Sequence, residues 1–164
     1  MGEAAKRIDP RLGHPVTREE AHDHIRRADR AGLIHVIGRN KLDSVWLDVA
    51  PGERLLTVCN CCPCCCLWKM LPSLNSAISG RITKMEGVEV SVDQSSCIGC
   101  GACQKVCFVD AIEVEGGKAH ITDQCRGCGR CVENCPNHAI EITAPTVSDI
   151  ENTIKRIREK VDVA

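Results

Sequence analysis

The chain has 164 residues with 21 Lys and Arg against 22 Asp and Glu, so no basic surface favours a nucleic-acid partner. Fourteen cysteines stand beside only three aromatic residues, which predicts a thin core that needs metal or disulfides for support. The sequence shows no signal peptide and no membrane span, so we expect a cytoplasmic protein whose reduced thiols bind metal.

The N-terminal part predicts an α/β extension over residues 1–87. Thr17 and Glu20 have the spacing of a capping box, which predicts a helix over about residues 18–31. The apolar segments 33–37 and 54–58 are typical of strands, and the second leads directly into a cysteine-rich run.

That run is CNCCPCCC, in which six of eight residues are cysteine. Neighbouring residues point in different directions on a strand or a helix, so the six thiols cannot all face one small site. Cys59, Cys62 and Cys65 are separated from one another by two intervening residues, the spacing that makes them the favoured metal ligands. The fourth ligand is then Cys66 or Cys61, with Cys64 the remaining candidate.

An internal repeat follows, in which residues 95–114 resemble residues 122–142. The cysteines of the first copy return 28 positions later, and the two sets are Cys97, Cys100, Cys103, Cys107 and Cys125, Cys128, Cys131, Cys135. Each copy predicts a metal loop, a short helix and a short strand. Two copies of one unit favour a pseudo-two-fold α+β fold over residues 88–143.

The second copy matches the run C-x₂-C-x₂-C-x₃-C-P in full, ending at Pro136, whereas Phe108 replaces the proline in the first. Residues 88–143 therefore resemble the bacterial two-cluster 4Fe-4S ferredoxins. The resemblance implies two 4Fe-4S clusters that pass single electrons, with the fourth cysteine of each run bound to the other cluster. The implied ligand sets are Cys97, Cys100, Cys103, Cys135 and Cys125, Cys128, Cys131, Cys107.

The neighbouring clusters make a third iron–sulfur cluster the favoured occupant of Cys59–Cys66, with structural zinc as the alternative. A CNCC-x-CCC run ahead of a two-cluster ferredoxin is also similar to ferredoxin-type proteins of anaerobic bacteria and archaea. That second resemblance implies a fold and adds little about function.

Residues 144–164 predict a C-terminal amphipathic helix. Ser148 and Glu151 have capping-box spacing, and an apolar stripe recurs at helical spacing through Ile150, Ile154, Ile157 and Val161. Such a stripe normally packs on the helix's own domain. The alternative interpretation is a helix that docks a partner.

Together these patterns predict an electron carrier, or the electron-transfer subunit of an oxidoreductase, that meets redox partner proteins and has no catalytic residues. One alternative is a reductase in which the site at Cys59–Cys66 is a catalytic cluster that reduces thiols or disulfides. Another is an interaction module in which zinc at Cys59–Cys66 is structural.

Overall fold

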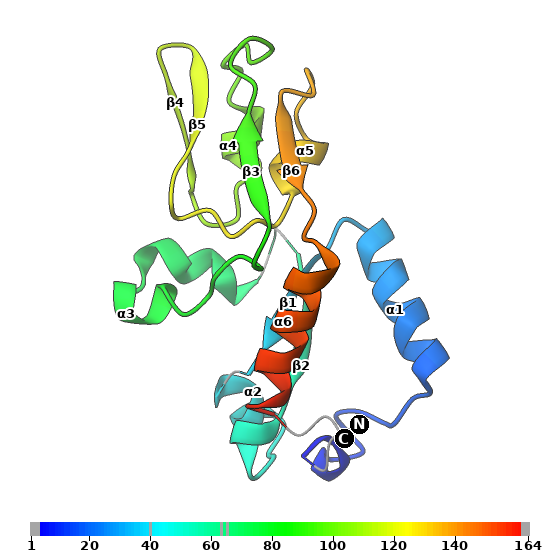
Figure 1. The fold of residues 1–164 in the computed structure, drawn as a ribbon. Helices are drawn as coiled ribbons and strands as arrows, with labels where there is room; N and C mark the ends of the chain where they lie inside the picture. The colour runs from blue at the N-terminus through cyan, green and yellow to red at the C-terminus, as the bar shows by residue number, and fades with distance from the viewer. Residues whose placement is uncertain (1–3, 40, 63, 65, 162–164) are drawn as a thin grey trace. The chain divides into compact units, whose positions relative to one another are not determined.

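The structure is a computed structural model that describes residues 4–39, 41–62, 64 and 66–161 (Figure 1). The chain forms two compact units, Met1–Cys61 with Glu151–Ala164, and Cys62–Ile150. The predicted boundaries lie at residues 87 and 143, whereas this division falls inside the cysteine-rich run and inside the last helix. Across the described residues, no helix combines the length and apolar character needed to cross a bilayer.

The first unit begins with the predicted helix, α1 (Arg18–Arg30). The Thr17 hydroxyl accepts a hydrogen bond from the Glu20 amide at 3.2 Å, and the Thr17 amide donates to the Glu20 carboxylate at 2.7 Å. This confirms the capping box, which satisfies two amides that the first helical turn leaves unpaired. The chain leaves the helix at Gly32, whose φ is +69°.

An antiparallel ladder of β1 (Ile34–Gly38) and β2 (Thr57–Cys61) follows. The second strand, predicted over residues 54–58, overlaps β2 at residues 57–58, so the strand exists but its predicted start is wrong. Gly52–Arg54 form a 3₁₀ helix, and Leu55 is buried against Ala4 and Val49, so pairing starts only at Thr57. The strand consequently extends into the cysteine-rich run. The sequence patterns also missed α2 (Lys41–Trp46).

The second unit opens with a 3₁₀ helix, Leu67–Ser73, and α3 (Ser76–Ser79). Two strand–helix–strand segments follow, in the order β3 (Glu89–Val92), α4 (Ala102–Val106), β4 (Ile112–Glu115), then β5 (Lys118–Ile121), α5 (Arg130–Glu133), β6 (Ile140–Thr143). β3 pairs antiparallel with β6 and β4 with β5, which Figure 1 shows as two ribbons of two strands. Pairing therefore joins the first strand of the region to the last.

Backbone conformation recurs at the 28-residue spacing of the repeat. Gly99 and Gly127 have φ values of +66° and +65°, and the non-glycine residues Asp110 and His138 have +52° and +50°. Positive φ is uncommon without glycine, so its occurrence at matched positions shows that both copies make the same turn. Phe108 is buried at 8% exposure and leaves that turn unchanged.

The last helix is α6 (Val147–Arg158). A cap at Ser148, as predicted, would start the helix at residue 149, two residues later than it begins. The Thr146 hydroxyl accepts from the Asp149 amide at 3.3 Å, and the Thr146 amide donates to the Asp149 carboxylate at 2.8 Å. The predicted capping box of Ser148 and Glu151 is therefore wrong. Both pairs have the same spacing, and the pair nearer to Pro145 forms the cap.

Substitution of Gly99 tests how closely the β4–β5 turn approaches the first cysteine loop. A Cβ at Gly99 would collide with the backbone carbonyl of Gly117, whereas a Cβ at Gly116 meets open space, and both glycines have positive φ. We expect G116A to cost only the left-handed backbone penalty of about 1–2 kcal/mol. G99A should cost roughly 1–3 kcal/mol more, because backbone must move. Thermal unfolding midpoints of the two iron-loaded variants measure the difference, and equal midpoints would contradict the close approach.

Candidate metal centre

Four cysteines from both copies of the repeat line a single cavity. Cys97, Cys100 and Cys103 come from the first copy, in the loop before α4 and in α4 itself, and Cys135 comes from the segment after α5. Apolar side chains, among them Ala119 and Ile140, form part of the wall. These four residues are one of the two ligand sets that the sequence implied, and the structure brings them together.

The other four cysteines interact electrostatically with one another. Desolvation, followed by the neighbouring charges of Cys128, Cys125 and Cys107, raises the pKa of Cys131 to about 12. Desolvation also raises the pKa of Cys128, and Cys107 and Cys125 add to it, although the Cys128 side chain is exposed. When these thiols are ionised, each thiolate disfavours the ionisation of its neighbours. A positively charged group that binds all four as thiolates would offset that repulsion.

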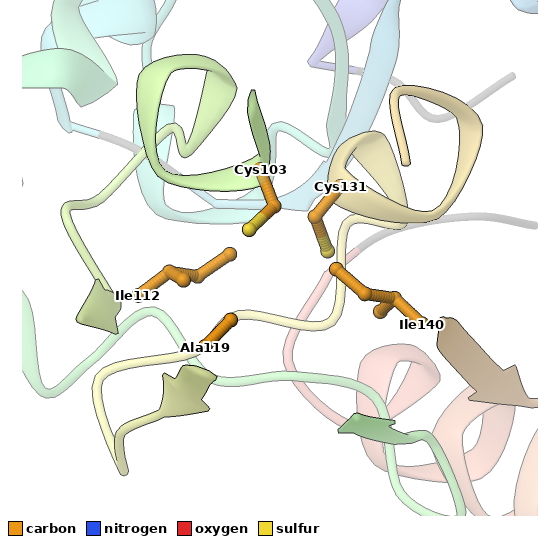
Figure 2. Close-up of a cluster of buried hydrophobic side chains, with 5 residues drawn as sticks. All are labelled: Cys103, Ile112, Ala119, Cys131 and Ile140. Atoms are coloured by element: carbon orange, nitrogen blue, oxygen red, sulfur yellow. The ribbon is translucent and has the colours of Figure 1, made fainter. Parts of the chain in front are cut away.

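The two thiols on the short helices belong to the core of this unit. Cys103 on α4 and Cys131 on α5 are only 6% and 8% exposed. Figure 2 shows both side chains pointing from their helices toward Ile112, Ala119 and Ile140, with which they form one buried cluster. Two of the five buried side chains in this core are therefore sulfur donors.

Backbone amides donate to four of the sulfur atoms. Ala111 N lies 3.1 Å from Cys107 Sγ, and at the matched position Ala139 N lies 3.3 Å from Cys135 Sγ. Two further amides donate at 3.4 Å, Ala119 N to Cys97 Sγ and Gly127 N to Cys125 Sγ. Amide donors stabilise negative charge on sulfur, and in iron–sulfur proteins such bonds help to set the reduction potential.

Cys97 differs from the more buried thiols in the direction of its pKa shift. Hydrogen bonds from the amides of Ala119 and Gly99 lower its pKa, and the nearby Lys118 ammonium lowers it further. Desolvation and, to a smaller extent, Asp93 act in the opposite direction without reversing the shift. In contrast, desolvation raises the pKa of Cys103, which faces the same cavity.

The first half of the cysteine-rich run lies on β2. Cys59 and Cys61 pair with Val36 and Ile34 in the ladder, so both point to one face of it, and Cys61 is buried at 4% exposure. Asn60 points to the other face.

The opposite face holds a chain of polar side chains that the sequence patterns missed. The Asn60 side chain bonds His35 Nδ1 at 2.8 Å and His24 Nε2 at 3.0 Å. Nothing in the sequence pattern links these residues, because His24, His35 and Asn60 lie far apart along the chain. Only the pairing of β1 with β2, with α1 beside β1, could have revealed this chain.

The second half of the run belongs to the other compact unit. Cys62 and Cys66 are half-buried and Cys64 is exposed, and the Cys64 thiol donates to Cys62 Sγ at 3.1 Å. The predicted ligand Cys65 lies outside the described residues. The selection of Cys59, Cys62 and Cys65 as ligands therefore stays a prediction.

The donors around the repeat fit iron–sulfur clusters by their chemistry. Within the part of the chain that the structure describes, no three Cys, His, Asp or Glu side chains converge as they would around one metal ion. In a 4Fe-4S cluster each thiolate binds a different iron, so the ligands surround the cluster and do not meet at one point. Eight thiols in two sets, four of them with amide donors, suit two such clusters.

Two comparisons with known proteins point to the same chemistry. Residues 90–142 match the family model of the 4Fe-4S dicluster domain. A segment of 33 residues is 52% identical to Ferredoxin-2 of Desulfomicrobium norvegicum, and it covers 20% of this chain and 56% of that ferredoxin. The chain thus spans little more than half the length of this curated relative. The findings make residues 90–142 similar to a bacterial-type 4Fe-4S ferredoxin domain.

Removing the iron should unfold the second unit from about residue 88 to residue 143, because its small core consists partly of the ligands themselves. We expect chelator treatment to abolish hydrogen-exchange protection of the amides in β4 and β5. The cluster of Ala4, Val49 and Leu55 in the first unit contains no cysteine and serves as the internal control. Retained protection of β4 and β5 in iron-free protein would contradict this prediction.

Proposed function

We propose that the chain is an iron–sulfur electron-transfer protein, a ferredoxin or an electron-transfer subunit, that relays single electrons through two 4Fe-4S clusters. One cluster is bound by Cys97, Cys100, Cys103 and Cys135, and the other by Cys107, Cys125, Cys128 and Cys131. Each cluster then joins the two copies of the repeat, which form a pseudo-two-fold pair. The acidic excess of residues 93–143, seven Asp and Glu against four Lys and Arg, favours low reduction potentials.

One observation supports this proposal above the others. Cys135 lies in the second copy of the repeat, yet it lines a cavity with three cysteines of the first copy. A ligand set that kept each copy separate would give Cys135 no reason to face Cys97. The exchange of the fourth cysteine is the arrangement expected of a two-cluster ferredoxin.

We further propose a third iron–sulfur cluster at Cys59–Cys66. Six thiols within eight residues exceed what one cluster needs. The favoured ligands are Cys59, Cys62 and Cys65, and the shared face of Cys59 and Cys61 on β2 favours Cys61 as the fourth over Cys66. Structural zinc is the alternative at this run.

Redox partner proteins are the expected partners, and α6 is the proposed docking element. Ile150 and Ile154 on this helix are 38% and 43% exposed, so part of its apolar stripe remains accessible. A stripe that packed only within its own domain would be covered more completely.

Metal analysis of anaerobically purified protein tests the proposal. We expect about twelve irons and twelve sulfides per chain, as three 4Fe-4S clusters require. About eight irons with one zinc would support the two repeat clusters and assign Cys59–Cys66 to structural zinc. A well-folded, colourless and iron-free protein would refute the function.

Pairs of substitutions test the exchange of the fourth cysteine. We expect C97A and C135A each to lose about four irons, and the double variant to lose no more, because both residues bind the same cluster. The matched double variant C97A/C107A should lose about eight irons, because it removes a ligand from each cluster. If C97A/C135A lost eight while each single variant lost four, the two residues would belong to different clusters.

A second function, a reductase acting on disulfides, is favoured by the contact of Cys64 with Cys62 at 3.1 Å. An exposed thiol beside a second thiol could reduce a substrate disulfide and form a disulfide of its own, which electrons from the clusters would reduce again. Incubating the reduced protein with a small disulfide tests this function. Release of free thiols with turnover would support it, and a C64A variant should then be inactive.

A further inference from the structure

Lys118, the first residue of β5, reaches across to the loop that precedes Cys97. Its ammonium donates to the carbonyl oxygens of Gln94 and Cys97, both at 2.6 Å. The side chain is half-buried. Two short charge-assisted hydrogen bonds fix the position of a positive charge that would otherwise move with a flexible side chain.

Other contacts join the same two segments. The Gln94 side-chain amide donates to the carbonyl of Ala119 at 3.0 Å, and the Ala119 amide donates to Cys97 Sγ at 3.4 Å. Gly99 lies so close to the carbonyl of Gly117 that no side chain fits there. The β4–β5 turn is therefore held against the first cysteine loop on both sides of Lys118.

The segment that lies against the second cysteine loop differs from the one that lies against the first. Position 90, which stands 28 residues before Lys118, is Val90 and carries no charge. The loop at Gly127 meets the aliphatic carbons of Val88 and Lys84.

The second loop contains Arg126 and Arg130, and the described hydrogen bonds of Arg126 are made to residues other than cysteine. They go to the carbonyl and side-chain oxygens of Gln124, at 2.7 and 3.3 Å, and to the carbonyl of Ser79 at 3.4 Å. In the first loop, by comparison, the Lys118 ammonium bonds the backbone carbonyl of a cysteine ligand, Cys97.

Asp93 is a negative charge that acts on the same loop, at Cys97. Its carboxylate accepts hydrogen bonds from the Ser95 amide and hydroxyl, at 2.8 and 2.7 Å, and from the Ser96 hydroxyl at 2.6 Å. These donors already stabilise the carboxylate charge. The Lys118 ammonium, in contrast, bonds the backbone of Cys97 itself.

We propose that Lys118 is a positioning residue that holds the β4–β5 turn on the first cysteine loop and raises the reduction potential of the cluster bound by Cys97, Cys100, Cys103 and Cys135. The inference rests on the proposed function. Reduction adds one electron to a cluster, and a fixed positive charge bonded to the backbone of one of its ligands stabilises the added electron. The second cluster is affected much less by Lys118, because the ammonium is bonded to the loop of the first cluster.

The test compares two variants. K118M replaces lysine with an uncharged side chain of similar length, and K118R keeps the positive charge. Lys105 is an exposed lysine on α4, so K105M is the matched control. Anaerobic redox titration, followed by the paramagnetically shifted NMR signals of the cysteine β protons, reports each cluster separately.

In K118M we expect the ratio of reduced to oxidised first cluster at a fixed potential to fall about tenfold, as one nearby, partly screened charge predicts. The second cluster should change less than twofold. K118R should restore most of the ratio, and K105M should leave both clusters unchanged because solvent screens an exposed charge.

Hydrogen exchange gives a second readout of the positioning role. The Ala119 amide, which donates to Cys97 Sγ, should exchange faster in K118M than in the wild type. Should K118M fail to bind its first cluster, K118Q replaces it, because glutamine removes the charge and keeps an amide donor.

An unchanged first-cluster potential, or an equal shift of both clusters, in a variant with full iron content would overturn the inference and leave the proposed function standing. Failure of K118R to restore the potential would also overturn it, because charge would then not be the cause. Iron-free wild-type protein would instead refute the function itself.

Discussion

The burial of thiol sulfur among a few aliphatic side chains is the constraint on which the second unit depends. Cys103 and Cys131 occupy core positions that a protein of this size would normally give to leucine or phenylalanine. A buried thiol is a small hydrophobic group when protonated, but metal binds it as a thiolate. The same two residues can therefore support the fold and bind metal, which explains why so few large side chains are present.

Backbone amides stabilise negative charge on four of the other sulfurs, those of Cys97, Cys107, Cys125 and Cys135. A thiolate in a desolvated site is costly, and the raised pKa of Cys131 reflects that cost. The turns that follow Cys107 and Cys135 each direct an alanine amide at the sulfur four residues earlier. Asp110 and His138 have positive φ in those turns, so the strained backbone is the same segment that directs an amide at the sulfur.

The sequence predicted those features that depend on spacing, and missed those that depend on contacts across the chain. The capping box at Thr17 and the strands of the repeat follow from local patterns. Two capping patterns overlap before α6, and only the structure selects Thr146. β2 starts late because Leu55 is buried elsewhere. α2 is short and its apolar side chains, such as Trp46, are exposed, so no core-facing pattern indicates it.

The same distinction separates the two cysteine-rich regions. For the repeat, the resemblance to ferredoxins supplied a pairing of residues far apart in sequence, and the cavity lined by Cys97 and Cys135 is consistent with it. For Cys59–Cys66 the resemblance gives no ligand set, and the spacing alone favoured Cys59, Cys62 and Cys65 as ligands. The strand period of two adds a constraint that spacing cannot supply, because it puts Cys59 and Cys61 on one face of β2. A short run rich in one ligand type predicts a metal site, whereas the backbone conformation decides which of its members can bind together.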